Sequence, residues 1–132
     1  MNKNILTILL PFSLISWFSF QDKEFEESIA RGKELYEELC ITCHLGNGKG
    51  TPGQVPPLAG ADYILKNPVN AIYAQKFGLD KPIVVNGVKY TTPMAPANIS
   101  DEEIADITNY ILNSWGNKSK MVTVKQVAAV KK

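Results

Sequence analysis

The pentapeptide Cys40-Ile41-Thr42-Cys43-His44 constrains this chain more than any other stretch. The pattern C-x-x-C-H is typical of the covalent attachment of a c-type haem. Two thiols about one helical turn apart can add to the two vinyl groups on one edge of the porphyrin, and the imidazole that follows can reach the iron. The motif therefore predicts one haem c, bound through thioethers to Cys40 and Cys43, with His44 as the proximal ligand.

Three other interpretations of the two cysteines compete. A thioredoxin-like dithiol expects a βαβ setting, whereas the residues before Cys40 have a helical pattern. A structural zinc site needs four ligands, but Cys40, Cys43 and His44 are the only Cys and His residues, so a carboxylate would have to be the fourth. A disulfide across two intervening residues would be strained and would leave His44 without a role. Haem attachment uses all three residues.

Length and net charge limit the classes of function that this chain can have. The chain has 132 residues, with 14 Lys and Arg residues against 13 Asp and Glu residues. That length predicts one domain, and the near-neutral charge gives no basic surface for nucleic acid. A domain of this size has a modest core, so we expect a covalently held porphyrin to form part of it.

The first twenty residues contain Lys3 and then an apolar run from Ile5 to Phe20, which Pro11 and Ser13 interrupt. This segment is too short and broken for a comfortable membrane span, which needs ~20 residues, and it is typical of a secretory signal. We expect a signal peptide or, alternatively, an uncleaved N-terminal anchor over residues 1–20. An exported monohaem domain should follow over residues 21–132, with its core at about 24–116 and a short C-terminal extension at 117–132.

Two amphipathic helices are expected near the ends of the domain. The first runs from about Asp22 to Cys40 and has Gly32 in its middle, where a bare backbone would let another helix approach closely. The second begins at a capping box formed by Ser100 and Glu103 and is expected to end at Gly116-Asn117. Shorter elements are predicted by local signals: one or two helical turns within Ala61–Lys66, a helix between Asn67-Pro68 and Phe77-Gly78, a hairpin with a type I′ turn over Ile83–Tyr90, and a terminal helix after Thr123 and Gln126.

A second axial ligand has few candidates. Such a ligand is commonly His or Met, and a second His does not exist. Of the three Met residues, Met1 lies in the apolar N-terminal segment and Met121 follows the last long helix. Met94 lies in a loop with Pro93 and Pro96, which restrict the backbone. We expect Met94 to be the ligand. The alternatives are Met121, a lysine, an open iron position, or a Met94 that only fills the core.

With these residues in place, the chain resembles a class I c-type cytochrome (monohaem, with His and Met ligands) over about residues 24–116. The family's opening pattern of a glycine, an aromatic residue and C-x-x-C-H stands here as Gly32, Tyr36 and Cys40–His44. The resemblance implies a mostly α cytochrome c fold, in which the N- and C-terminal helices cross and loops wrap around one haem, with a small β-hairpin. It also implies that Gly32 packs against an aromatic residue of the last long helix, for which Tyr110 is the match.

The resemblance implies further haem-binding residues. The family's Pro-x-Leu after the haem-binding loop matches Pro56-Pro57-Leu58, so Pro56 and Leu58 are expected in the site. The proline carbonyl would accept the N–H of the proximal imidazole, which sets its tautomer. The stretch Pro57–Tyr63, the hairpin and the last helix together look closest to cytochrome c domains associated with copper nitrite reductases and periplasmic dehydrogenases. One departure concerns the ligand loop, since the family usually has Pro directly after Met and Ala95 stands there in this chain.

The expected function is that of a periplasmic one-electron carrier between respiratory donors and a terminal reductase or oxidase. His and Met ligands would leave the iron no open position, and Met raises the reduction potential. Partners would be redox proteins, among them copper nitrite reductase, a terminal oxidase or a periplasmic dehydrogenase, and any membrane contact would come only through an uncleaved N-terminal segment. The small contact surface would be mostly uncharged and would comprise Ile41, Thr42, Ala95, Pro96 and Ala97. Two rivals stay open: a haem enzyme or a gas- or peroxide-binding protein with an open or labile sixth position, and an interaction module of a larger reductase.

Overall fold

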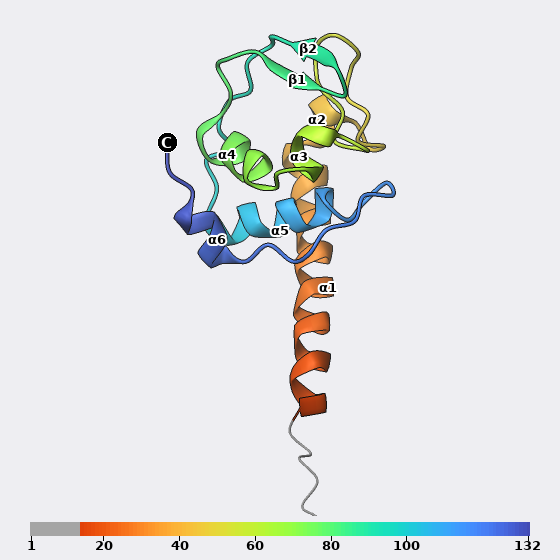
Figure 1. The fold of residues 1–132 in the computed structure, drawn as a ribbon, viewed down its shortest axis with the longest axis vertical. Coiled ribbons are helices and arrows are strands. Elements are labelled where there is room, and N and C mark those ends of the chain that lie inside the picture. Colours follow the sequence, from red (N-terminus) through yellow and green to blue (C-terminus); the bar gives the residue numbers. More distant parts are fainter. Residues whose placement is uncertain (1–13) are drawn as a thin grey trace, which may run out of the picture.

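The computed structural model describes residues 14–132 of the chain. Its elements are α1 (Leu14–Leu39), α2 (Ile41–His44), α3 (Asp62–Leu65), α4 (Val69–Phe77), β1 (Ile83–Val85), β2 (Val88–Tyr90), α5 (Asp101–Ile111) and α6 (Val124–Ala129). The two strands pair antiparallel, and helices and loops make up the rest of the body (Figure 1). The predicted fold class, mostly α with one small hairpin, is confirmed.

Helix α1 begins earlier than the pattern predicted, at Leu14 rather than near Asp22. Its N-terminal part projects from the body, and its C-terminal part lies against α5 (Figure 1). The predicted boundary at residue 20 therefore falls inside α1, while the first 13 residues of the predicted signal or anchor lie outside the described part of the chain. Within residues 14–132, no helix is both long enough and apolar enough to cross a membrane.

The crossing of α1 and α5 is built on Gly32. A side chain at this position would overlap the backbone carbonyl of Asp106, so only glycine allows this approach. The close approach at Gly32 is confirmed, and the atoms nearest to it belong to Asp106 and Ile107 rather than to the expected Tyr110. Tyr110 lies one turn further along α5 and packs instead against Tyr36, with 5.3 Å between the ring centroids. The backbone of α1 at Gly32 thus contacts the backbone of α5 at Asp106, and the rings of Tyr36 and Tyr110 pack together one turn away.

A partly buried ionic network reinforces the same crossing. Ser28 Oγ donates to Asp106 Oδ1 at 2.6 Å, and Arg31 donates to the same carboxylate from Nε (2.7 Å) and from a terminal nitrogen (3.0 Å). Asn109 Nδ2 donates to Ser28 Oγ at 2.9 Å. The carboxylate raises the pKa of the Arg31 guanidinium above its ordinary value, mainly through this hydrogen bond. The helices are therefore fixed in orientation as well as in distance.

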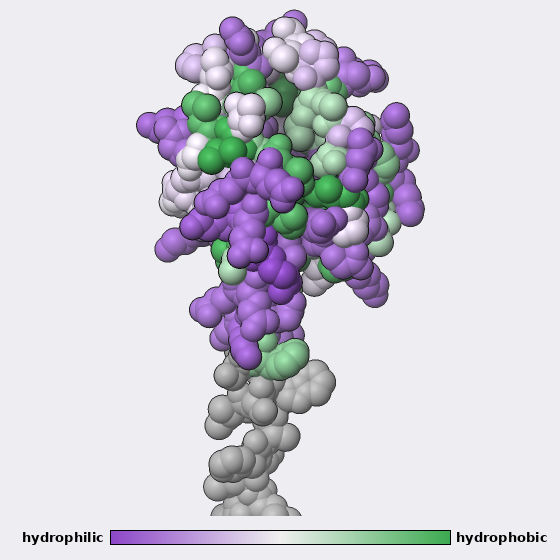
Figure 2. All heavy atoms as spheres, turned by 180° about the vertical axis from the view of Figure 1, so that it is seen from behind, coloured by the Kyte–Doolittle hydropathy of each residue, from purple (hydrophilic) through white to green (hydrophobic). Residues whose placement is uncertain are grey.

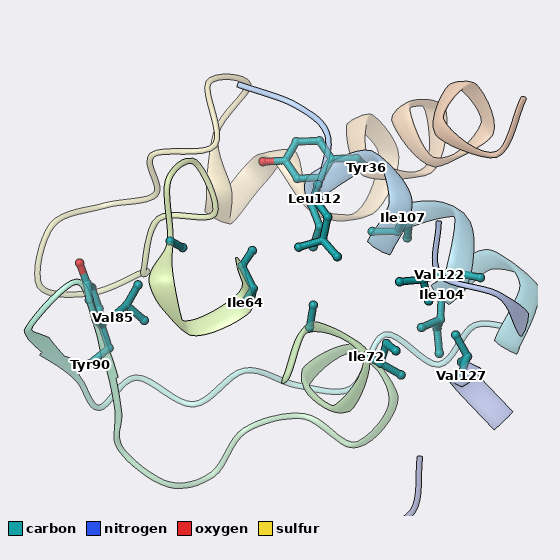
Figure 3. Close-up of a cluster of buried hydrophobic side chains, with 14 residues drawn as sticks. Tyr36, Ile64, Ile72, Val85, Tyr90, Ile104, Ile107, Leu112, Val122 and Val127 are labelled. Atoms are coloured by element: carbon teal, nitrogen blue, oxygen red, sulfur yellow. The ribbon is translucent and has the colours of Figure 1, made fainter. Parts of the chain in front are cut away.

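The core can be divided into two groups according to whether the side chains line the cavity, and Figure 3 shows members of both. The closed group lies between α4, α5 and the C-terminal segment, where its side chains fill the space against one another: Ile72, Ile104, Val122 and Val127. The cavity group comes from α1, α3, β1 and α5, and its side chains surround a cavity: Tyr36, Ile64, Val85 and Ile107. Figure 2 shows the opposite side of the molecule, where hydrophobic side chains gather on the body while hydrophilic ones cover α1.

Local signals confirm most element boundaries. Ser100 and Glu103 form the predicted capping box of α5, and Thr123 and Gln126 form that of α6. In the hairpin both turn residues, Asn86 (φ 51°) and Gly87 (φ 79°), have positive φ, as a type I′ turn requires. The side chain of Asn67 accepts a 3.3 Å hydrogen bond from Val69 N, but α4 begins at Val69 with Pro68 in the capping position, one residue later than predicted.

The end of α5 was predicted wrongly. The helix stops at Ile111 rather than at Gly116-Asn117. Asparagine side chains compete for the carbonyls of its last turn: Asn113 Nδ2 donates to Asn109 O at 2.9 Å, and Asn117 Nδ2 donates to Ile111 O at 2.8 Å. The chain then turns away, with Trp115 at a φ of 54°. Side-chain amides thus end the helix before its glycine does.

Candidate haem site

A cavity in the body brings together five of the six predicted site residues. The cavity opens to solvent and measures about 590 Å³ with that open space included, and its walls are almost wholly apolar. Cys40, His44, Pro56, Leu58 and Met94 line it, together with the cavity group. Cys43, the sixth, is exposed beside Cys40. Ligand and cofactor sites are concave and lined mostly by apolar side chains, and the apolar walls of this cavity suit the flat face of a porphyrin.

The His44 imidazole is held by the loop that follows it. Its Nδ1 lies 3.2 Å from the carbonyl oxygen of Pro56, so the Nδ1–H donates to that oxygen and Nε2 keeps its lone pair. Burial lowers the pKa of His44, and the hydrogen bond to Pro56 opposes this shift. A neutral imidazole with a fixed tautomer is the form that can ligate iron. The predicted contact between His44 and Pro56 is therefore present.

The two cysteines lie where α1 gives way to α2. Cys40 is half-buried and Cys43 exposed, and both are free thiols, so the disulfide alternative is not realised. The motif follows helix α1 and no strand, which is not the thioredoxin-like setting. Across the described residues, no group of three or more His, Cys, Asp or Glu side chains is placed to hold a metal ion, as a structural zinc site would need. Burial, followed by the neighbouring Cys43, raises the pKa of Cys40 to about 11.

An aromatic cluster shapes the backbone after His44, and its role was not predicted from the sequence. Leu45 has a φ of 62°, which a bulky residue rarely adopts. Tyr36 Oη donates to Leu45 O at 2.7 Å, and Trp115 Nε1 donates to Gly46 O at 3.0 Å. Tyr36, Trp115 and Tyr110 pack together, with ring centroids 5.3 to 5.5 Å apart. These contacts hold a strained turn directly after the predicted iron ligand.

The rest of the loop after His44 is held by hydrogen bonds within the loop and by hydrogen bonds to Asn117, which follows α5. Leu58 N and Ala59 N both donate to Gly48 O, at 2.7 and 2.9 Å. Asn117, fully enclosed, donates to Leu58 O at 3.0 Å and accepts from Gly60 N at 2.8 Å. A pattern of helical periodicity could not have indicated Asn117, because the residue acts after the helix has ended. The loop that carries Pro56 and Leu58 is thus fixed from both sides.

Met94 lies in a short extended segment that α4 holds in place. Met94 and Leu79 exchange two backbone hydrogen bonds, at 2.8 and 2.9 Å, and Ala97 N donates to Gln75 O at 2.8 Å. Gly78 (φ 74°) lies so close that a side chain there would collide with the Met94 carbonyl and with Pro96. The departure at Ala95 is therefore compatible with an ordered loop. Met121 does not line the cavity.

Comparisons with known proteins agree with this site. The family model for cytochrome c matches residues 29–115. A cytochrome c-552 from Thermus thermophilus is 39% identical over 105 residues, which cover 76% of this chain and 79% of that protein. The cytochrome c subunit of a quinone-type alcohol dehydrogenase from Gluconobacter oxydans is 32% identical over 97 residues, and the cytochrome subunit of fructose dehydrogenase from Gluconobacter japonicus is 33% identical over 108. The chain spans only 19% and 22% of the length of these two subunits.

Fold and site together define a small c-type cytochrome, in which crossed helices and ordered loops enclose one apolar cofactor cavity. The chain belongs to the cytochrome c family. Membership implies that haem c is the cofactor and that the protein carries electrons. The predicted class is thus confirmed.

Proposed function

We propose that this protein is an exported one-electron carrier whose haem c is attached through Cys40 and Cys43 and ligated by His44 and Met94. The observation that carries the proposal is that His44 and Met94 line the same apolar cavity, with Cys40 at its wall. A haem bound there supplies a reversible Fe(III)/Fe(II) couple, and a Met ligand favours the reduced form. The protein's own part is to fix the two ligands, through Pro56 and through Leu79, and to exclude water.

The periplasm is the compartment we propose, because the apolar segment over residues 1–20 has the composition of a secretory signal. The similarity to dehydrogenase cytochrome subunits supports a periplasmic dehydrogenase as electron donor. Copper nitrite reductase and a terminal oxidase are the acceptor classes proposed from the sequence. On the contact surface, Thr42, Ala95 and Pro96 are exposed, while Ile41 and Ala97 are half-buried. Such a small uncharged patch suits a brief encounter that buries less than ~1,200 Å².

The test compares two methionine variants of the holoprotein. Met94→Ala should abolish the sulfur-to-iron charge-transfer band of the ferric protein, lower the reduction potential and allow cyanide or imidazole to bind. Met121→Ala, the matched control, should change none of these, because Met121 lies outside the cavity. The reverse result would overturn the ligand assignment. A wild-type ferric protein that lacks the band at neutral pH would favour the rival function, a haem enzyme or gas-binding protein with an open position.

A further inference from the structure

Gln75 has a buried oxygen atom that no protein group satisfies. The residue lies on α4, is 5% exposed and lines the haem cavity. Among the described residues, its Oε1 is the buried side-chain polar atom without a hydrogen-bond partner. Most buried polar atoms in proteins are paired, so an unpaired acceptor at the wall of a cofactor cavity suggests a role toward the cofactor.

The orientation of the Gln75 amide is fixed by its other end. Nε2 donates to Ala71 O at 3.1 Å and to Thr108 Oγ1 at 2.9 Å. If the amide were reversed, Oε1 would face the carbonyl oxygen of Ala71, and two acceptors would repel each other. The nitrogen end is therefore directed at the α4 backbone and at α5, and the oxygen end is the one left free.

Gln75 is also tied to the ligand loop, because its backbone oxygen accepts the hydrogen bond from Ala97 N. The backbone at Gln75 is thus joined to the loop that carries Met94. Around it the cavity walls are almost wholly apolar, so that a dipole here is weakly screened.

We propose that Gln75 tunes the reduction potential by placing the negative end of its amide dipole at the wall of the haem cavity. Ferric haem carries one more positive charge than ferrous haem, so a nearby carbonyl oxygen stabilises the ferric form and lowers the potential. This opposes the effect of the Met ligand and of burial. The inference rests on the proposed haem site.

A merely structural role is the competing explanation, since the bond to Thr108 joins α4 to α5. Two variants separate the roles. Gln75→Leu removes both the helix-to-helix bond and the carbonyl, whereas Thr108→Val removes the bond and leaves the carbonyl in place, where Ala71 still holds Nε2. Both should lose stability, but only Gln75→Leu should move the potential.

The experiment is redox titration of the purified holoprotein and its variants. At a fixed electrode potential, Gln75→Leu should lower the ratio of ferric to ferrous protein threefold to tenfold, which is a rise of about 28 to 59 mV for a one-electron couple. Thr108→Val should change the ratio less than twofold. Gln75→Met, which is unbranched and of similar length, should show the same rise, and it keeps the test available if the leucine variant does not fold.

Equal potentials in wild type and Gln75→Leu would overturn the proposal, as would equal shifts in Gln75→Leu and Thr108→Val. Failure of the proposed function would look different. In that case the wild-type protein would itself lack covalent haem or the sulfur-to-iron band, before any variant of Gln75 is considered.

Discussion

The closed group and the cavity group are equally well buried, yet they differ in what fills the space between their side chains. In the closed group, side chains from α4, α5 and the C-terminal segment meet one another directly (Figure 3). In the cavity group, side chains of similar size and burial surround a cavity that both predicted iron ligands also line. The first part of the core needs only protein, and the second needs an apolar cofactor to complete it.

The two parts are also held differently. Behind the closed group, Asn109 exchanges hydrogen bonds with the Val122 backbone at 2.7 and 2.9 Å, and Lys76 donates to Val127 O at 3.1 Å. Around the cavity, loops hold the two predicted ligands. Pro56 O accepts a hydrogen bond from His44, and Leu79 exchanges backbone hydrogen bonds with Met94. Loops can follow the shape of a cofactor in a way that regular helices cannot, which explains why both predicted ligands lie at or beyond helix ends.

The largest effect should come from removing the haem. A Cys40→Ser/Cys43→Ser double variant should bind no haem covalently and should lose at least ~3–5 kcal/mol, the cost of a large deletion from a core. A small domain has only ~5–15 kcal/mol of stability, so we expect the variant to be largely unfolded by circular dichroism. Either single variant should keep its haem through the one remaining thioether or lose the haem altogether. A folded, protease-resistant double variant would show that the cavity group is stable alone.

Gly32 tests the crossing that joins the two parts of the core. Gly32→Leu should cost ~1–3 kcal/mol or more as overpacking, because any side chain there overlaps the Asp106 carbonyl. Ala30→Leu is the matched control, since Ala30 is exposed on the same helix and the change should be nearly neutral. Thermal unfolding of both holoproteins measures the difference. Equal melting temperatures would mean that the helices can move apart at little cost.

The same deletion in each part of the core should have different consequences. Val127 and Val85 are both at most 2% exposed, so Val→Ala at either should cost about 1.5–3 kcal/mol, from two lost carbon groups and a residual space. Val85 lines the haem cavity and Val127 does not. Val85→Ala should therefore also shift the haem absorption spectrum and the potential, while Val127→Ala should leave both unchanged. Equal spectral changes would contradict the division into two parts.

How far the sequence predicted this molecule depends on the range of each signal. Local signals worked well: the Ser100–Glu103 box, the Asn86-Gly87 turn and the C-x-x-C-H motif each depend on a few adjacent residues, and a hydrogen bond or a φ value follows from them. Gly32 was identified as a close approach, but its partner was missed by one turn because helical periodicity fixes a face of α5 and not a register along it.

Interactions between distant segments could not be predicted in the same way. Asn117 ends α5 and holds Leu58, and Tyr36 and Trp115 hold the turn after His44, through backbone atoms 6 to 69 residues away. Side-chain to backbone bonds of this kind leave no periodic pattern. The free oxygen of Gln75 is also invisible in the sequence, since it results from where α4 meets Thr108.

The smallest effect concerns the attachment of the hairpin beside the cavity. Asp62 N donates to Asn86 Oδ1 at 2.9 Å, and Asn86 N donates to Asp62 Oδ1 at 2.7 Å. The hydrogen bond from Asn86, followed by that from Lys66, lowers the pKa of Asp62 below its ordinary value. A carboxyl with a lowered pKa in the folded state stabilises the fold above its ordinary pKa of ~3.9, and this contribution disappears as the pH falls through the lowered value.

Asp62→Asn should therefore be slightly less stable than the wild type at neutral pH, and the difference should shrink as the pH is lowered below about 4. Urea unfolding of the two holoproteins across this range measures the difference directly, because acid effects on the haem ligands are common to both. Lys66→Met removes only the smaller cause and should show part of the same loss. A difference that stays constant with pH would mean that the Asp62 charge does not stabilise the hairpin, and that the carboxyl acts there only as a neutral acceptor.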